Sequence, residues 1–533
     1  MNQNSSAGRL SIPSYIIISF LTIFAIGPQY FINLSYTMNQ EIVQNGLHFG
    51  SEELLIPSTL ANIAFALGIP FGPVLTRVLG FRKNYLFMVF LFLCGSIIGA
   101  ITPNLLLLII ARVIQSISAG VLFLTILPVS LRSFPNKIRN TFLFMVITGL
   151  FGATAMGALF GSLSLSVDAW RWLYMLNILS ACLCLIVGYI SLPRSNEQNQ
   201  HASIDKTGAF LFCLIMIILA FPLYNLMDKG FASIYVWPFF GVAIILILLF
   251  IVIDLKAEMP LIPFRTLKAA KPISGTVMAI ASHVLLVLSI AGINGFLRHN
   301  MDLPFHYLLH LYFWFFIGIL ITAILHTFLY SALGAGKLGI IGSLAVIYVS
   351  LQWRTMSPEI SLPVLYFQVA CLGAGVSMVL VGGALGTAFA GDLHFAPMRS
   401  ATLHSIRNFV GAVVTPMVGW VISIQNTIQY EHIRGNLGQF SSEAKLEMVQ
   451  LINRLVENGM SASEAKNIAF YELIADSKKA AILGAYHHLF TIMLIVAIIM
   501  LLASIGKMVT GKGLGLVKKE KKTDPSNEKV SIN

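Results

Sequence analysis

The sequence predicts an all-α integral membrane protein with about 14 transmembrane helices. Hydrophobic residues make up 57% of the 533 positions, charged residues only 11%, and the mean hydropathy is +0.83. A soluble domain of this size would need a far more polar surface. The apolar runs also have the length that a helix needs to cross a hydrocarbon layer about 30 Å thick.

No acidic residue lies near the middle of any of these apolar runs. The first run is longer than the apolar segment of a signal peptide, and no A-x-A-like cleavage site follows it, so we expect it to be retained as a helix. In chain order the expected spans are 13–37, 54–76, 84–101, 104–131, 141–165, 172–192, 207–225, 235–254, 272–296, 305–330, 338–353, 363–388, 402–424 and 482–506.

Basic residues are concentrated in every second loop, which places most of them on one side of the membrane. An even number of spans places both termini on one side, which the positive-inside rule assigns to the cytoplasm. The inner loops then hold Arg77, Arg82, Lys83, Arg132, Lys137, Arg139, Arg194, Lys206, Lys256, Arg265, Lys268, Lys271, Lys337 and Arg399. The short outer loops hold only Arg171, Lys229, Arg298 and Arg354.

Two polar segments interrupt the apolar pattern. Residues 193–206 form an inner linker, and residues 425–481 form a long outer loop. Within the outer loop, Ser442 to Asn458 predicts an amphipathic helix, and Ser461 with Glu464 predicts a capping box that opens a second helix. The residues after Lys507 form a basic tail that we expect to be disordered.

The net charge of +12 does not indicate nucleic-acid binding, because the basic residues lie in short loops between apolar spans. All five cysteines fall inside expected spans without metal-ligand spacing, so we expect neither a cofactor nor a metal.

Arg112 is the clearest ionisable group at bilayer depth, where a charge costs about 2.5–3.5 kcal/mol or more and therefore usually has a task. It lies with Gln115 in ARVIQSISAG, which resembles the R-x-x-Q-G motif of the major facilitator superfamily, with Ser116 in place of the glycine. The resemblance implies a role in proton transfer and gating for Arg112 and Gln115. A structural arginine that bonds to the backbone is the alternative.

Two further segments resemble motifs of the same superfamily. The inner loop 72–83 is similar to G-x-L-x-D-R-x-G-R-[RK] through Gly72, Arg77, Gly80, Arg82 and Lys83, although Thr76 replaces the family's Asp. The fifth span is similar to the antiporter motif G-P-x-x-G-G. Its small residues, which also suit plain helix packing, are Gly149, Gly152, Gly157 and Gly161.

WRWLYMLN, at residues 170–177, is similar to a segment of the 14-span drug:proton antiporter family, as are residues 260–270 and 401–420. This resemblance implies a major facilitator fold that uses alternating access around a central site. It divides the chain into an N-terminal six-helix half (1–192), a linker with two extra helices (193–271), a C-terminal six-helix half (272–506) and a basic cytoplasmic tail (507–533).

The first span departs from that family, because Pro28 replaces an acidic residue that the family usually carries. Gln29, Asn33 and Tyr36 could instead offer a neutral polar surface to a substrate cavity, or form hydrogen bonds between helices. The missing acid makes cationic substrates and ordinary proton coupling less expected.

Histidines are the remaining titratable side chains in the spans. His283, His306 and His310 are candidates for a pH-sensitive role, since an ordinary histidine titrates at about pH 6.5. The HxxxH spacing of His306 and His310 also resembles a desaturase iron box, but no second inner cluster accompanies it. Polar packing near the interface is the simplest interpretation.

The sequence therefore predicts a transporter rather than an enzyme. It would export small amphipathic compounds across the bacterial cytoplasmic (inner) membrane, coupled to protons. Its partners would be a small-molecule substrate, the lipid bilayer and, in an organism with two membranes, a periplasmic adaptor. Alternatives are a transporter of a neutral or anionic metabolite, lipid or siderophore-like molecule, a receptor that transports nothing, and a membrane-bound His-box oxidase.

Overall fold

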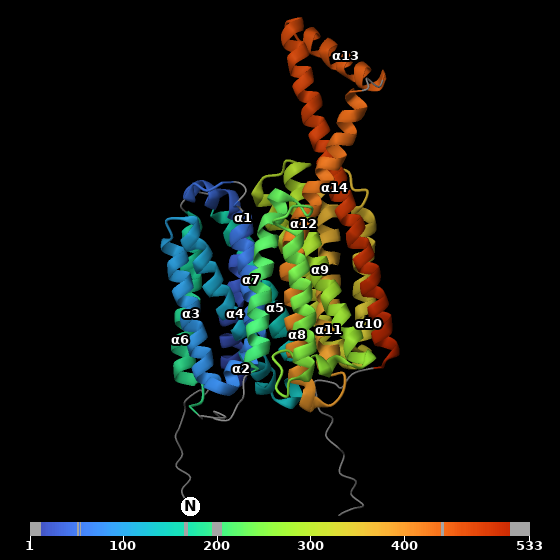
Figure 1. Cartoon of the computed structure of the whole chain (residues 1–533). Coiled ribbons are helices and arrows are strands. Elements are labelled where there is room, and N and C mark those ends of the chain that lie inside the picture. The colour runs from blue at the N-terminus through green and yellow to red at the C-terminus, as the bar shows by residue number, and fades with distance from the viewer. Residues whose placement is uncertain are drawn as a thin grey trace, which may run out of the picture.

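The computed structural model describes residues 12–50, 53, 55–164, 169–194, 205–438 and 442–511. These residues form helices and no strand, and long helices that lie side by side make up the body of the molecule (Figure 1). The expected linker 193–206 and the basic tail lie largely outside this part of the chain.

The N-terminal half contains six long helices. Their apolar lengths match the expected spans to within a few residues, except that the first helix continues about ten residues beyond its apolar run. They are α1 (Ser14–Leu47), α2 (Ile56–Leu79), α3 (Phe81–Ile101), α4 (Leu105–Ser133), α5 (Thr141–Leu163) and α6 (Trp172–Ser191). Close backbone contacts hold this half together. A Cβ at Gly68 or Gly120 would lie 2.4 or 2.3 Å from a carbonyl oxygen of the facing helix, so α2 and α4 can pack this tightly only through glycine.

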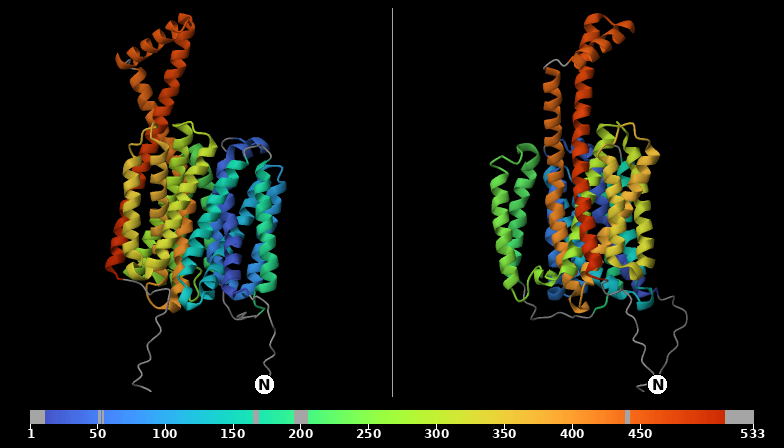
Figure 2. Two further views of the ribbon diagram at one scale, coloured as in Figure 1. Left: turned by 180° about the vertical axis from the view of Figure 1, so that it is seen from behind. Right: turned by 90° about the vertical axis from the view of Figure 1, so that its right-hand side faces the viewer.

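The two extra helices are α7 (Lys206–Lys229) and α8 (Trp237–Lys256). Figure 2 shows this pair at the side of the bundle, and α7 packs on both α2 and α12. The pair therefore lies along the line where the two halves meet.

The C-terminal half is built from α9 (Ala270–His299), α10 (Phe305–Trp353), α11 (Leu362–Ala388), α12 (Ala396–Gly438) and α14 (Ala462–Val509). Thirteen of the described helices are long and apolar enough to cross a membrane.

The helix α10 contains two spans. Gly334 inside it has φ +73°, a left-handed conformation that interrupts the helix. A Cβ at Gly318 would meet the carbonyl oxygen of Ala370, and one at Gly342 would meet that of Gly375. A straight helix would separate Gly318 from Gly342 by about 36 Å. Their contact residues on α11, Ala370 and Gly375, are only about 7.5 Å apart along the helix. The chain must therefore turn back at Gly334, and the fold is consistent with the predicted 14 spans.

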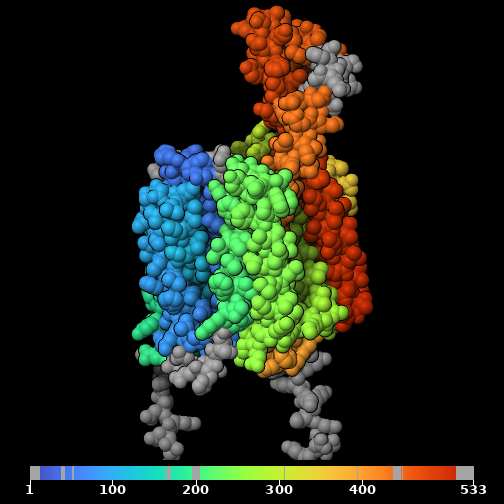
Figure 3. All heavy atoms as spheres, viewed as in Figure 1, coloured from blue at the N-terminus to red at the C-terminus, as the bar shows by residue number. Residues whose placement is uncertain are grey.

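An arm of helices projects from one face of the body, as Figure 3 shows. It consists of the extended ends of α12 and α14 and of α13 (Ser442–Glu457), which is the predicted amphipathic helix. Ser461 caps the next helix as expected, since its Oγ accepts a hydrogen bond from the Glu464 amide at 3.3 Å. The expected boundaries at 424 and 482 are wrong, however, because both spans continue outward as polar helices without a break.

Candidate functional site

The candidate substrate residues of α1 lie against Arg112 of α4. The guanidinium Nη2 of Arg112 donates a 2.6 Å hydrogen bond to Oδ1 of Asn33, and its carbon lies 5.4 Å from the ring centre of Tyr36. Gln29 donates from Nε2 to Oγ of Ser116 at 2.8 Å. We call these five residues, Gln29, Asn33, Tyr36, Arg112 and Ser116, the α1–α4 network.

Arg112 is the charged residue of this network and is buried, with 1% of its surface exposed. Its Nε and Nη1 atoms have no hydrogen-bond partner among the described residues. No acidic residue occurs between Glu53 and Asp168 in the sequence, so no carboxylate from α2, α3, α4 or α5 can neutralise it. An amide oxygen and an aromatic face are weak substitutes for a carboxylate, and the network keeps a net positive charge.

Gln115 does not join Arg112. It faces α3 instead, where its Nε2 donates to Oγ of Ser96 at 2.9 Å. Arg112 and Gln115 are three residues apart on one helix, yet α1 and α3 pack on different sides of α4.

The inner-loop motif contains a neutral hydrogen-bond network where the family has an acid. Nδ2 of Asn84 donates to the hydroxyls of Thr76 and Thr125 at 3.0 and 2.9 Å. Thr76, in the position of the family's Asp, therefore takes part in uncharged bonds between α2, α3 and α4.

The other motif residues surround this network. Gly72 packs on the carbonyl oxygen of Val121, 2.6 Å from where its Cβ would lie, and Gly80 has φ +80°. Arg82 donates to the carbonyl oxygen of Tyr189 at 2.6 Å, Arg77 contacts Met259, and Lys83 is exposed. Their bonds link the ends of α2, α3 and α6 and the segment that follows α8.

The glycines of α5 face both halves. A Cβ at Gly149 would meet the side chain of Ile23 at 2.6 Å, and one at Gly157 would lie 2.4 Å from the carbonyl oxygen of Phe31 on α1. Gly152 faces Phe316 of α10 at 3.5 Å. Gly161 accepts a hydrogen bond from Ser164 at the end of the helix.

The candidate histidines whose side chains are described lie on different helices. His283 in α9 is partly buried, His310 in α10 is exposed and lies 6.4 Å from the ring of Tyr366, and the side chain of His306 is outside the described atoms. Among the described side chains there is no group of three His, Cys, Asp or Glu residues that could hold a metal ion.

The sequence analysis missed a second buried cation, Arg407 in α12. It lies with His404 beside Phe123 of α4, so residues of both halves meet there. The signal was present, because Arg407 lies within the expected span 402–424, as Arg112 lies within its own. A charge within an apolar run is the pattern that singled out Arg112.

Two other cations that were expected in a loop and a tail are also buried. Arg399 donates to the carbonyl oxygens of Thr387, Ala388 and Asp392 at 2.7–3.1 Å. Lys507 donates to those of Lys271 and Gly386 at 2.8 and 2.6 Å. Both side chains thus satisfy the free carbonyls at the C-terminal end of α11, where a positive charge is favourable.

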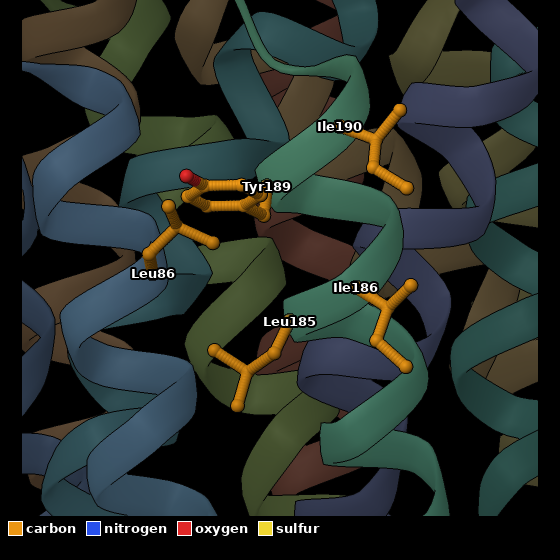
Figure 4. A pocket seen from close by; sticks show the side chains of 5 residues that line it. All are labelled: Leu86, Leu185, Ile186, Tyr189 and Ile190. Carbon is orange, nitrogen blue, oxygen red and sulfur yellow. The ribbon is translucent and has the colours of Figure 1, made fainter.

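A groove on the surface of α3 and α6 lies beside Arg82, whose hydrogen-bond acceptor Tyr189 is part of its lining. It has a volume of about 410 Å³ and is lined by Leu86, Leu185, Ile186, Tyr189 and Ile190, which come from α3 and α6 (Figure 4). Its lining is apolar and opens on the surface of the bundle, as expected for a face that contacts lipid.

Comparison with known proteins agrees with this architecture. The sequence model of the Major Facilitator Superfamily matches residues 16–419. The chain is 29% identical over 408 residues to the MFS-type transporter YubD of Bacillus subtilis, covering 76% of this chain and 80% of YubD. Multidrug resistance protein 3 of Bacillus subtilis is 27% identical over 39% of this chain and 40% of its own length. Quinolone resistance protein NorB of Staphylococcus aureus is 26% identical over 33% of this chain and 38% of its own length.

Among solved structures, a peptide transporter POT bound to sulfate has a TM-score of 0.58 at 13% identity, covering 95% of this chain and 97% of the transporter. A bacterial homologue of the lysosomal transporter Spinster has a TM-score of 0.51 at 13% identity, covering 95% and 100%. These likenesses support the fold.

Proposed function

Because the chain belongs to the Major Facilitator Superfamily, we propose that it is a secondary active transporter that exports small amphipathic compounds by alternating access. The observation that carries the proposal is the burial of polar and charged side chains on α1, α4 and α12, where helices of the two halves face each other. A membrane protein that only needed to be stable would gain little from cations at that depth.

The α1–α4 network is the proposed coupling element. The hydrogen bond from Arg112 to Asn33 joins two helices of one half, and we propose that it forms in only one of the alternating conformations. The glycine contacts of α5 with α1 bring backbones close together, while Gly152 faces α10 of the other half. Among these glycines, Gly152 is the small residue at the contact between the halves, where it favours movement of one half against the other.

Export rather than import is proposed from the likeness to Multidrug resistance protein 3 and to NorB. Use of the proton gradient is proposed from the sequence motifs that resemble the drug:proton antiporter family. Membership of the 14-span drug:proton antiporter family is proposed on both grounds. The spans lack a central carboxylate to carry a proton. Histidines such as His283 are therefore the proposed titrating groups.

The proposed orientation places both termini in the cytoplasm and the arm outside, in the cytoplasmic membrane of a bacterium. The charge asymmetry of the loops supports this orientation. The arm is the proposed contact site for a periplasmic adaptor in a two-membrane organism, since it extends beyond the body.

The experiment is a comparison of a deletion strain, a complemented strain and a strain that carries Arg112→Ala. Susceptibility and export are measured across compound classes, and flux is measured in inverted membrane vesicles with and without an uncoupler. We expect at least one amphipathic compound to accumulate in the deletion strain and its vesicle transport to stop when the gradient is dissipated. No change for any compound class would contradict the proposal.

A second candidate, a transporter of a neutral or anionic compound, is favoured by one observation. The chain has no acidic residue near the centre of a span that could balance a cationic substrate.

A further inference from the structure

Arg407 is a buried cation without a carboxylate in its neighbourhood. It is 7% exposed and lies within the expected span 402–424, five residues or about 7.5 Å of helix from its first residue. No Asp or Glu occurs between Asp392 and Glu431, so its own helix offers none at this depth. In the part of the chain that the structure describes, the ion pairs join other residues.

Aromatic side chains of the N-terminal half surround this guanidinium. Its carbon lies 5.9 Å from the ring centre of Phe123 on α4, and Tyr30 on α1 lies close to it. Tyr30 in turn packs edge-on against Phe65 of α2, with ring centres 6.1 Å apart, and Phe65 lies 6.3 Å from Phe123. Two helices of one half thus present rings to a cation of the other half, and Phe65 of a third helix packs against both rings.

Two imidazoles complete the surroundings of Arg407. His404, one turn before it on α12, lies edge-on to Phe123 at 5.0 Å between ring centres. His283 of α9 packs on Gly411, one turn after Arg407, where a Cβ would lie 2.2 Å from its Nε2. We call Tyr30, Phe65, Phe123, His283, His404 and Arg407 the junction cluster.

The junction cluster contains nitrogen atoms that are free to form hydrogen bonds with a ligand. Nε of Arg407 and Nδ1 of His404 are buried without a hydrogen-bond partner among the described atoms. A guanidinium that keeps its charge but lacks partners is costly inside a membrane. A carboxylate is the group whose two oxygens match its planar donors, and it also supplies the missing negative charge.

We infer that the junction cluster is the binding site for an amphipathic organic anion, with Arg407 holding its carboxylate and the rings of Tyr30, Phe65 and Phe123 contacting its apolar body. This inference rests on the proposed transport function and names its substrate class. A cationic compound would meet Arg407 and two imidazoles with no opposing charge, whereas a neutral compound would leave the guanidinium unsatisfied.

The test uses three probes that share one naphthalene ring: 2-naphthoate, 2-naphthamide and 2-naphthylmethylammonium. Binding to the purified full-length protein in lipid nanodiscs is measured by isothermal titration calorimetry. We expect 2-naphthoate to bind about tenfold or more tightly than the amide, the effect of one charge-assisted pair, and the ammonium to bind most weakly.

Arg407→Gln should remove the preference for the carboxylate over the amide, and Arg407→Lys should keep part of it because the charge remains without the planar fork. Arg434→Gln is the matched control. It also removes one arginine charge, but its side chain lies on the arm with 67% of its surface exposed. The control should keep the order of the three probes.

Three results would overturn the inference: equal binding of carboxylate and amide, tighter binding of the ammonium, or failure of all three probes to bind. A preference that persists in Arg407→Gln would also overturn it. If that variant cannot be purified in a folded form, the binding order of the three probes is measured on the unchanged protein and on His404→Gln instead. Equal binding of carboxylate and amide to the unchanged protein would still overturn the inference.

Flux in proteoliposomes separates this inference from the proposed function. Transport of the amide or the ammonium without transport of the carboxylate would retain the transporter and reject the anion site. Carboxylate binding that depends on Arg407, without flux of any probe, would retain the site and reject transport.

Discussion

The hydrogen bond between Arg112 and Asn33 should control the conformational cycle more than it controls folding. In Arg112→Met the chain loses a charged hydrogen bond of 2.6 Å and a cation–π contact at 5.4 Å. These contribute about 1.5–3 kcal/mol and about 0.5–2 kcal/mol, respectively. The same change removes a buried cation whose desolvation costs several kcal/mol. The two effects oppose each other, so we expect normal membrane levels and little change in thermal unfolding.

Transport by Arg112→Met should nevertheless fall. If the bond forms in only one of the alternating conformations, a loss of about 1.5–3 kcal/mol shifts their ratio by about 10- to 160-fold. We expect flux in inverted vesicles to drop at least about tenfold, with partial recovery in Arg112→Lys. Arg354→Met, at an exposed outer arginine, is the control.

Asn33→Leu provides the opposite test of the same bond. It leaves Arg112 buried without its acceptor, so this variant should unfold at a lower temperature than wild type. The double variant Asn33→Leu/Arg112→Met should be more stable than Asn33→Leu alone. Wild-type flux in Arg112→Met, or a double variant that is the less stable of the two, would refute the reasoning.

Three further predictions concern packing, orientation and the arm. Gly157→Ala places a Cβ 2.4 Å from the backbone oxygen of Phe31 and should cost about 1–3 kcal/mol. Gly152→Ala, with 3.5 Å to a phenyl ring, should be tolerated, and equal melting temperatures would contradict the packing argument. A cysteine at Ser442 should react with an impermeant maleimide in intact cells, and reaction only after permeabilisation would reverse the orientation. Deletion of 436–476 should keep the protein inserted and at least partly active in inverted vesicles. Whole-cell resistance should fall further only where an adaptor is used, and complete loss in vesicles would instead make the arm part of the transport cycle.

Much of the fold could be predicted because each membrane span is visible in the sequence itself. Apolar runs of fixed length and the distribution of basic residues place the spans without knowledge of any contact. The extensions of α12 and α14 could not be found in this way, because polar helices outside the membrane have no apolar run to mark where they end. The continuation of α1 beyond residue 37 was missed for the same reason.

The site could be predicted only in part. Polar residues within apolar spans were the signal for Arg112, Asn33 and Tyr36. The structure brings these three side chains together. Arg407 carried the same signal, but its meaning depends on partners from three helices far away in sequence. The pairing of Gln115 with Ser96 likewise depends on which side of α4 each neighbour covers.

Efflux of two compounds of opposite charge from proteoliposomes tests most directly the claim that this transporter has no acidic residue near the middle of its spans. The pair is an amphipathic monocarboxylate and a lipophilic dication, each loaded into vesicles with and without the protein. We predict protein-dependent efflux of the carboxylate and dication efflux no faster than from protein-free vesicles, because a dication would meet buried arginines and no carboxylate. Robust protein-dependent efflux of the dication would contradict the account.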